Sequence, residues 1–349
     1  PVDTFQNETP AINLYRFKNA KVSTGLSAVW ANGFLYIDRN TKAENSRANY
    51  KAGPLKIFDE KFSLLSQKEE ELEGDTEGGV LFLGGSGSAN YYHWLIEILP
   101  KLFTLNQKLL KEWNITAILV DASVFRIPSF RASLELVLER LSLALRVIVA
   151  PSGWVLFGNL YYINTFNNIL FNSLSGSILK NDFYFSKNIL EKYIDATRRR
   201  GVGGEKATPK RIFLLRQESS VSEYNKRTYN QTEIFDIFKS FGFIGVHVEK
   251  LSFQEQMNLF ASASYIVGPS GAAWANLIFC ESKARCLSWL NENFQNFSVY
   301  STLAAQAGCD MRFVQCSLVQ AGESHGPYVL NPLAVKDFLA QEWQPALIE

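Results

Sequence analysis

The stretch "IVGPSGAAWANLIFC", from Ile266 to Cys280, has the pattern of a buried strand followed by a turn of small residues and a helix. Strand–turn–helix units of this kind are the building blocks of α/β proteins. The small residues at the turn have two explanations. They allow a helix to pack closely on a sheet, or they allow an anion to approach the free backbone N–H groups where the helix begins.

The same alternation of elements continues on both sides of this stretch. Before it we expect a strand at 211–216, a helix at 230–242, a strand at 244–250 and a helix at 252–263. After it we expect a strand at 284–290 and a helix near 298–307. Strands that alternate with helices at this spacing predict βαβ units and a parallel sheet.

A second region of alternating elements lies in the N-terminal half. We expect a strand at 80–83, a Gly-rich loop at 84–89, a helix at 91–109 interrupted by Pro100, a strand at 115–121, a helix at 129–144 and a strand at 145–150. Residues 11–60 alternate apolar and polar side chains between Gly and Asn turns, which predicts short antiparallel strands. The acidic residues 67–79 are predicted to form a solvated loop.

These patterns predict an α/β protein with two Rossmann-like domains facing a cleft and a β-rich N-terminal extension. A chain of 349 residues is long enough for two hydrophobic cores. The expected parts are an acceptor-side domain at 1–200 (β-rich at 1–75, α/β at 76–200), a second α/β domain at 201–330 and a helical segment at 331–349 that crosses back to the first domain. The linker is expected at Arg198–Lys210, which combines charge, glycines and a proline.

Composition argues against several classes of protein. A net charge of +1, with no dense basic run beyond Arg198–Arg200, argues against a nucleic-acid partner. The four cysteines lack the spacing of a zinc site and are expected to be reduced core thiols. With no signal peptide and no apolar run of 18 residues, we expect a cytoplasmic protein, either free or held at the inner face of a membrane. The sequence begins at Pro1, which is compatible with removal of an upstream segment.

The Gly-rich loop "GGSGSAN", residues 84–90, fits neither of the two motifs that it approaches. A nucleophile elbow requires glycine where Ser88 stands, and a dinucleotide fingerprint requires a third glycine where Asn90 stands. The chain also has no P-loop, no D-x-D carboxylate pair and only three histidines. These observations favour chemistry without a metal cofactor.

The residues after this loop, "NYYHWLIEILPKL", carry candidate acid–base groups. His93 and Glu97 are four residues apart and are expected to share one helix face near the cleft. The alternative is structural: His93 is then a histidine at the edge of the core, Glu97 a solvated charge, and Asn90 a helix N-cap.

Four segments in this order, "NYYHWLIEILP", "RIFLLR", "LSFQEQ" and "IVGPSGAAWANLIF", resemble glycosyltransferase family 61 over about residues 20–320. The likeness is to transferases of the bacterial capsule type. It implies a GT-B fold and an inverting, metal-independent reaction with a nucleotide-sugar donor, usually linked to UDP. It also implies a glycan or lipid-linked glycan as the acceptor, in the synthesis of a surface polysaccharide.

The resemblance implies roles for individual residues. The base for the acceptor hydroxyl is Glu97, with His93 as the second candidate. The expected substrate-binding residues are Asn90, Tyr92, Arg216, Arg227, Glu249, Gly268, Ser270, Gly271, Ala272 and Asn276. In this set the arginines and the loop glycines stabilise the leaving diphosphate, and Glu249 accepts hydrogen bonds from the ribose. Ser270 is a departure, because the family often carries histidine at that place.

A second hypothesis follows from that departure. The chain would then be an inactive nucleotide- or glycan-binding module of the same fold, with Ser270 as the mark of lost chemistry. An NAD-dependent oxidoreductase is excluded, because no complete Gly-rich fingerprint follows the first strand of either domain.

Overall fold

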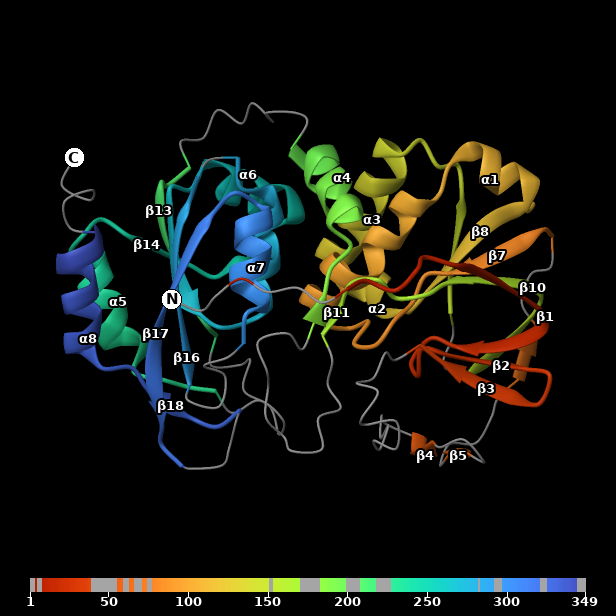
Figure 1. Ribbon diagram of the computed structural model, residues 1–349, viewed down its shortest axis with the longest axis horizontal. Coiled ribbons are helices and arrows are strands. Elements are labelled where there is room, and N and C mark those ends of the chain that lie inside the picture. Colours follow the sequence, from red (N-terminus) through yellow and green to blue (C-terminus); the bar gives the residue numbers. More distant parts are fainter. Residues whose placement is uncertain are drawn as a thin grey trace. The chain divides into compact units, whose positions relative to one another are not determined.

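The structure, a computed structural model (Figure 1), divides into two compact units that are described separately. The N-terminal unit comprises Gln6–Ser177 and Asp182–Ala196, and the C-terminal unit comprises Thr197–Glu349 with Pro1–Phe5 and Ile178–Asn181. The structure describes residues 4, 8–38, 55–58, 63–65, 71–73, 77–150, 153–169, 183–198, 208–217, 227–281, 283–291, 297–320 and 325–343.

The N-terminal unit is built on a mixed sheet in the order β3-β2-β1-β10-β7-β8-β9. Its strands are β1 (Leu14–Ser23), β2 (Ala28–Ala31), β3 (Phe34–Ile37), β7 (Gly79–Phe82), β8 (Ile115–Val120), β9 (Arg146–Val149) and β10 (Trp154–Ile163). The predicted parallel set β7-β8-β9 and the predicted antiparallel set β1-β2-β3 are both confirmed. β10 joins them, because it pairs antiparallel with β1 and parallel with β7.

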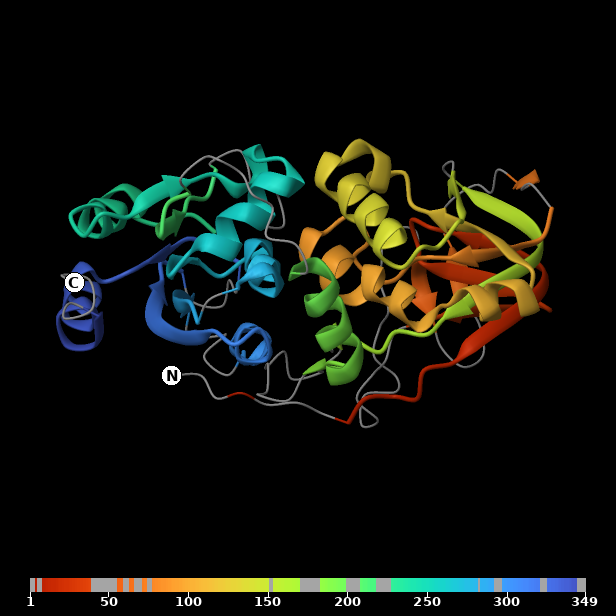
Figure 2. The same ribbon diagram turned by 90° about the horizontal axis from the view of Figure 1, so that it is seen from above.

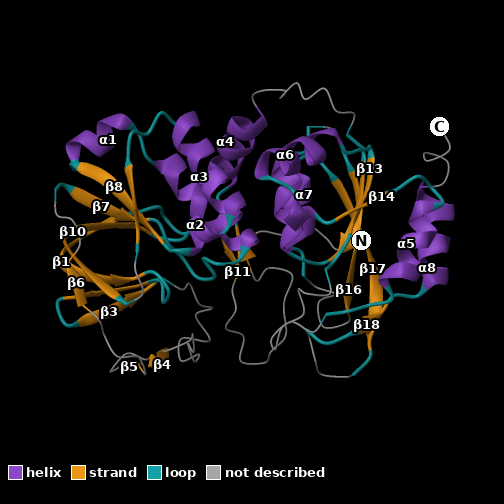
Figure 3. Cartoon of the chain, turned by 180° about the vertical axis from the view of Figure 1, so that it is seen from behind, coloured by secondary structure: helices purple, strands orange, loops and turns teal. Residues whose placement is uncertain are grey.

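Buried apolar runs explain the middle of this sheet, since β7 is buried throughout and β8 at all but one residue. Figure 3 shows the helices of the unit gathered beside these strands. They are α1 (Gln107–Glu112), α2 (Ser123–Arg126), α3 (Pro128–Arg140) and α4 (Lys187–Arg198). The smaller paired strands are β4 (Leu55–Phe58) with β5 (Ser63–Leu65), and β11 (Asn168–Ile169) with β12 (Phe183–Tyr184).

The C-terminal unit is a second sheet, in the order β14-β13-β15-β16-β17-β18. Its strands are β13 (Arg211–Leu214), β14 (Ile244–Val246), β15 (Tyr265–Pro269), β16 (Arg285–Asn291), β17 (Asp310–Leu318) and β18 (Tyr328–Val329). All pair in parallel except β18. Figures 1 and 2 show α6 (Phe253–Ser262) and α7 (Val299–Gln306) on one face, and α5 (Gln231–Lys239) and α8 (Pro332–Phe338) on the other. Both units therefore confirm the α/β class.

Four predictions about elements need correction. The strand expected at 244–250 ends at Val246, and the 3-10 helix η5 (Val248–Lys250) follows it. The helix expected at 91–109 is divided near Pro100, as predicted, but its parts are of other kinds: residues 91–92 are α-helical, and a π-helix, η2 (His93–Ile98), a 3-10 helix, η3 (Leu99–Thr104), and then α1 follow. Proline has no N–H to continue the helical ladder, so Pro100 accounts for the change. The acidic loop expected at 67–79 contains a short strand, β6 (Glu71–Glu73), which pairs with β10.

The C-terminal segment packs within its own unit. Val335, Leu339 and Trp343 are buried in one core with Phe213 and Phe238. This segment, α8 with the short π-helix η8 (Leu339–Trp343), covers α5, in contrast to the predicted crossing to the first domain. The described part of the chain has no helix that is long and apolar enough to cross a membrane.

Candidate functional site

His93 and Glu97 form a hydrogen-bonded pair on η2 of the N-terminal unit. Nδ1 of His93 lies 2.7 Å from Oε2 of Glu97. The other carboxylate oxygen, Oε1, accepts the backbone N–H of Ile169 at 3.1 Å. The side chain of His93 is 15% exposed, whereas that of Glu97 is 3% exposed. The shared face predicted from the sequence is therefore confirmed, and the imidazole is the member of the pair that reaches the surface.

The loop before η2 holds the imidazole in place. Oδ1 of Asn90 accepts the N–H of Tyr92, and the Asn90 carbonyl accepts the N–H of Trp94, both at 2.9 Å. Asn90 thus caps the first turn, which is the structural alternative left open by the sequence. The Tyr92 side chain is 3% exposed, and its ring meets the His93 imidazole edge-on at 5.7 Å. Tyr92 therefore supports the imidazole from within the protein.

A second hold on η2 comes from a distant part of the chain. Pro100 cannot donate to the carbonyl of Ile96, four residues earlier. That carbonyl instead accepts Nδ2 of Asn167 at 2.8 Å, and Oδ1 of Asn167 accepts the N–H of Ser186 at 2.7 Å. Asn167 is fully buried. The turn that carries Glu97 is therefore anchored to the segment around β11.

Lys101 is a buried cation beside the His93–Glu97 pair. Its role was not predicted from the sequence. Its side chain is 1% exposed, and Nζ donates to the carbonyl of Gly84 at 2.8 Å and to the hydroxyl of Tyr162 at 3.0 Å. Burial lowers the pKa of Lys101 to about 8, although the charges of Asp38 and Glu97 oppose the shift. The available signal was a lysine in an otherwise apolar run, "ILPKLF", four residues after Glu97.

Arg216 occupies the carboxyl end of β13 in the C-terminal unit. Its Nη1 donates to the carbonyl of Arg227 at 3.1 Å, and its Nη2 donates to the carbonyl of Ser270 at 2.7 Å. Its backbone N–H and carbonyl are both bonded to the amide of Gln231, at 2.7 Å and 3.1 Å. Arg216 therefore ties two loops together at one edge of the sheet.

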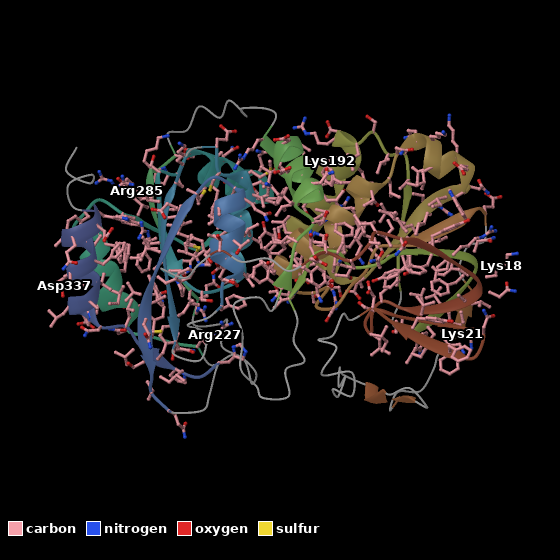
Figure 4. The ribbon with its side chains drawn as sticks, viewed as in Figure 1. Lys18, Lys21, Lys192, Arg227, Arg285 and Asp337 are labelled. Atoms are coloured by element: carbon pink, nitrogen blue, oxygen red, sulfur yellow. The ribbon has the colours of Figure 1, made fainter. Side chains whose placement is uncertain are left out.

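Arg227 completes what we call the arginine cluster, Arg216 and Arg227. Burial and the neighbouring charge of Arg216 lower the pKa of Arg227. Burial and the same two charges lower the pKa of His325, which favours the neutral imidazole. Burial raises the pKa of Tyr300, which hydrogen-bonds Ser270. The two like charges held together at the end of the sheet create a site of positive potential (Figure 4, Arg227). No sequence motif pointed to His325 or Tyr300.

The two glycines of the opening stretch have different surroundings. A Cβ on Gly268 would lie 2.5 Å from Cβ of Leu214, on the neighbouring strand. A Cβ on Gly271 would have Nη2 of Arg216 as its nearest neighbour, at 3.5 Å. Packing therefore explains Gly268, whereas Gly271 leaves the backbone open beside a guanidinium group. Ala272 follows as the first residue of the 3-10 helix η6 (Ala272–Phe279).

Asn276 and Glu249 lie apart from these contacts. Asn276 is fully buried, and its Nδ2 donates to Oε1 of Gln256 at 3.3 Å, between η6 and α6. Glu249 is 48% exposed on the 3-10 helix η5 (Val248–Lys250). That helix follows β14, whose carboxyl end lies beside that of β13. The structure thus places Glu249 at the same edge of the sheet as the arginine cluster, and Asn276 in the interior.

All four cysteines are free and buried, as predicted. Among the described residues, no group of three or more His, Cys, Asp and Glu side chains is arranged to hold a metal ion.

Comparison with known proteins places the chain in a family. A search of curated proteins finds no match. The family model Glycosyltransferase 61 matches residues 91–287, more than half of the chain. The matched segment includes both the His93–Glu97 pair and the arginine cluster. The chain therefore belongs to the glycosyltransferase 61 family and is a glycosyltransferase.

Proposed function

We propose that this glycosyltransferase is an inverting, metal-independent enzyme that transfers a sugar from a UDP-linked donor to a hydroxyl group of a glycan acceptor. Its pathway would be the synthesis of a surface polysaccharide, such as a capsule. The proposal includes a GT-B organisation, in which the N-terminal unit binds the acceptor and the C-terminal unit binds the nucleotide. The presence of a set of parallel strands in each unit supports that division.

The observation that carries the proposal is the His93–Glu97 pair. A partly exposed imidazole that is hydrogen-bonded to a buried carboxylate is the arrangement of a general base with an orienting partner. Both oxygens of Glu97 already accept hydrogen bonds, so the geometry favours His93 as the base. Glu97, the first candidate from the sequence, would fix the tautomer of the ring and stabilise the imidazolium that forms.

The proposed step transfers one proton and exchanges one bond. The imidazole of His93 takes the proton of the acceptor hydroxyl, and the acceptor oxygen forms a bond to the anomeric carbon of the donor. The bond between that carbon and the diphosphate oxygen breaks, and its electron pair leaves with UDP. Attack opposite the leaving group inverts the anomeric configuration.

The arginine cluster would stabilise the departing diphosphate. Two guanidinium groups supply positive charge, and the backbone of Ser270 and Gly271 beside them is open to an anion. In this proposal Glu249, at the same edge of the sheet, binds the ribose. The arginines would take the place that a divalent cation has in other nucleotide-sugar enzymes.

Nucleotide binding tests the role of the cluster. Calorimetric titration with UDP is expected to give the same dissociation constant with EDTA as with magnesium. Arg216→Lys should weaken UDP binding at least tenfold, because lysine cannot keep both hydrogen bonds of the fork. Arg211→Lys is the matched control, since Arg211 starts the same strand and bonds the carbonyl of Phe241 at 2.7 Å. UDP binding that requires magnesium, or that falls equally in both variants, would overturn this assignment.

Turnover tests the role of the pair. Hydrolysis of a donor, in which water takes the place of the acceptor, releases UDP and identifies a usable donor without a known acceptor. The donors to test are UDP-glucose, UDP-galactose, UDP-xylose and UDP-N-acetylglucosamine. With that donor, His93→Ala and Glu97→Gln should each reduce turnover by about 10²-fold or more, with unchanged UDP affinity. Glu135→Gln is the control, because Glu135 forms an exposed i,i+4 pair with Arg131. UDP binding without turnover of any donor would favour the inactive binding module.

A further inference from the structure

A cavity of about 320 Å³ opens on the N-terminal unit. Its lining comes from β1, β2, β3, β7 and β10 and from the turns that adjoin them. The volume is at the lower end of the range for small-molecule sites and is sufficient for one small cyclic ligand. All of the described residues that line it belong to this unit.

Aromatic rings form one wall of the cavity. The rings of Phe17 and Tyr36 lie 5.2 Å apart and are tilted by 56°. Tyr15 and Tyr36 are each 44% exposed, and Phe34 beside Tyr36 is 66% exposed. Large side chains of this kind that remain exposed together mark a binding surface more often than a structural one. Flat apolar faces that carry a hydroxyl at the tip suit a ligand that has both C–H and O–H groups.

A fixed carboxylate lines the same cavity. Oδ2 of Asp38 accepts the hydroxyl of Tyr162 at 2.8 Å and also the backbone N–H of Thr165. No described residue forms a hydrogen bond with the second oxygen, Oδ1. The side chain is 16% exposed and lines the cavity, so the carboxylate is accessible to a ligand hydroxyl. An ionised carboxylate accepts hydrogen bonds from hydroxyl groups more strongly than a neutral acceptor does.

Two contacts connect the cavity to the loop that carries the imidazole. Ser27, in the cavity wall, donates its hydroxyl to the carbonyl of Gly85 at 2.5 Å. Lys101 donates to the carbonyl of Gly84, lies 3.9 Å from Asp38, and interacts electrostatically with Glu97. One buried lysine therefore links the carboxylate of the cavity to the carboxylate of the His93–Glu97 pair.

From this arrangement we propose that the cavity binds one monosaccharide ring of the acceptor glycan. Tyr36 and Phe17 pack against the C–H face of the ring, and Asp38 accepts hydrogen bonds from its hydroxyls. The other exposed aromatic side chains on β1 and β3 contact the neighbouring sugars. The inference rests on the proposed function, because the acceptor is a glycan only if the enzyme transfers sugar to one.

The test measures saccharide binding separately from donor chemistry. Saturation-transfer NMR with methyl glycosides of glucose, galactose and mannose is expected to show millimolar binding of at least one. Tyr36→Ala and Asp38→Asn should each weaken that binding at least tenfold. Phe125→Ala is the matched control, since Phe125 is an aromatic residue on α2, 39% exposed and outside the cavity. Binding of none of the three glycosides, or equal loss in Tyr36→Ala and Phe125→Ala, overturns the inference.

Two further readouts keep this result distinct from the proposed function. Affinity for UDP and hydrolysis of the donor are measured on the same samples, and Phe125→Ala should leave both within twofold of the unsubstituted protein. If the unsubstituted protein releases no UDP from any donor, the proposed function fails while saccharide binding can still be observed. Asp38→Asn keeps the shape of the side chain and Tyr36 is 44% exposed, so both variants are expected to fold, which thermal unfolding checks.

Discussion

A Cβ atom on Gly87 would lie 2.6 Å from Cδ2 of His93, because the backbone of the Gly-rich loop runs directly against the imidazole. Gly87 also has φ = +76°, a conformation that favours glycine. Gly87→Ala should therefore displace the ring and reduce turnover at least tenfold. The free energy of unfolding should fall by about 1–2 kcal/mol from the backbone conformation. Steady-state rates and urea denaturation measure the two effects.

Gly308→Ala is the control for this prediction. Gly308 has φ = +79°, and nothing lies within 4 Å of a Cβ placed there. The substitution should carry a similar backbone cost and leave turnover unchanged. Equal losses of activity in both variants would show that the contact between Gly87 and His93 has no special role.

The two glycines of the stretch Ile266–Cys280 should respond differently to alanine. Gly268→Ala places a methyl group 2.5 Å from Cβ of Leu214 and should cost about 1–3 kcal/mol of stability through overpacking. Gly271→Ala should change stability by less than about 0.5 kcal/mol, because its nearest neighbour is 3.5 Å away. It should nonetheless weaken UDP binding at least fivefold, since the methyl group occupies the approach to the backbone. Wild-type affinity in Gly271→Ala would remove this loop from the phosphate site.

The buried charge of Lys101 should make stability depend on pH. Burial lowers its pKa from 10.5 to about 8, so between these values the unfolded chain binds a proton that the folded chain does not. Stability from this group therefore increases as the pH rises. The free energy of unfolding, relative to that of Lys101→Met, should increase by about 2 kcal/mol from pH 7.5 to 9.5. Burial raises the pKa of Tyr162 well above 10, so Tyr162 stays neutral over this range.

Urea denaturation followed by tryptophan fluorescence at several pH values measures the effect. Lys187→Met is the control, because Lys187 is 71% exposed in an i,i+4 pair with Glu191. The difference in the free energy of unfolding between Lys187→Met and the unsubstituted protein should not change with pH. A flat difference for Lys101→Met as well would show that the lysine keeps its ordinary pKa in the folded protein.

Cys309 should be the most reactive of the four cysteines. Hydrogen bonds from the thiols of Cys280 and Cys286 lower its pKa, whereas the hydrogen bond to Cys309 and burial raise the pKa of Cys280. Cys309 is 8% exposed, and Cys316 is 3% exposed. Iodoacetamide at pH 7 should therefore label Cys309 at least tenfold faster than Cys316, which peptide mass spectrometry quantifies.

The pH profile of that labelling separates thiolate chemistry from exposure alone. The rate for Cys309 should be nearly flat from pH 6.5 to 8.5, and a tenfold rise per pH unit would contradict a lowered pKa. Cys309 is hydrogen-bonded to Cys286, which lies on β16 next to Arg285. Arg285 is at the end of the sheet opposite Arg227 (Figure 4). Labelling of Cys309, which immediately precedes β17, should therefore leave UDP affinity unchanged.

The elements that could be predicted are those whose pattern of apolar residues is contained in a short stretch of sequence. The strands β7, β8, β13, β15 and β16 are short apolar runs beside helices with a clear apolar face, and each lies where it was expected. The strand β10 was missed, because its sequence "WVLFGNLYYI" has no helix or tight turn that marks it as part of a βαβ unit. Its place in the sheet depends on pairing with β1, more than 130 residues earlier in the chain.

The candidate site shows the same division. The i,i+4 spacing of His93 and Glu97 was enough to predict their contact, because one helical turn brings them together. The environment of Lys101 was not predictable, since Asp38 and Tyr162 are separated by 124 residues and meet only in the folded sheet. Both arginines of the cluster were among the residues that the sequence pointed to. Its fixed geometry comes from loop carbonyls that have no sequence signature.

The anchoring of η2 has a consequence for the order of events during synthesis. The groups that hold the turn of Glu97, the side chain of Asn167 and the N–H of Ile169, are 71 and 72 residues further along the chain. Closing so long a loop costs entropy before any contact is made, so we expect these contacts to form late in folding. A nascent chain that ends before residue 169 therefore contains both His93 and Glu97 but lacks the groups that order them. Synthesis of the chain to at least residue 169 thus precedes the ordering of the acid–base pair.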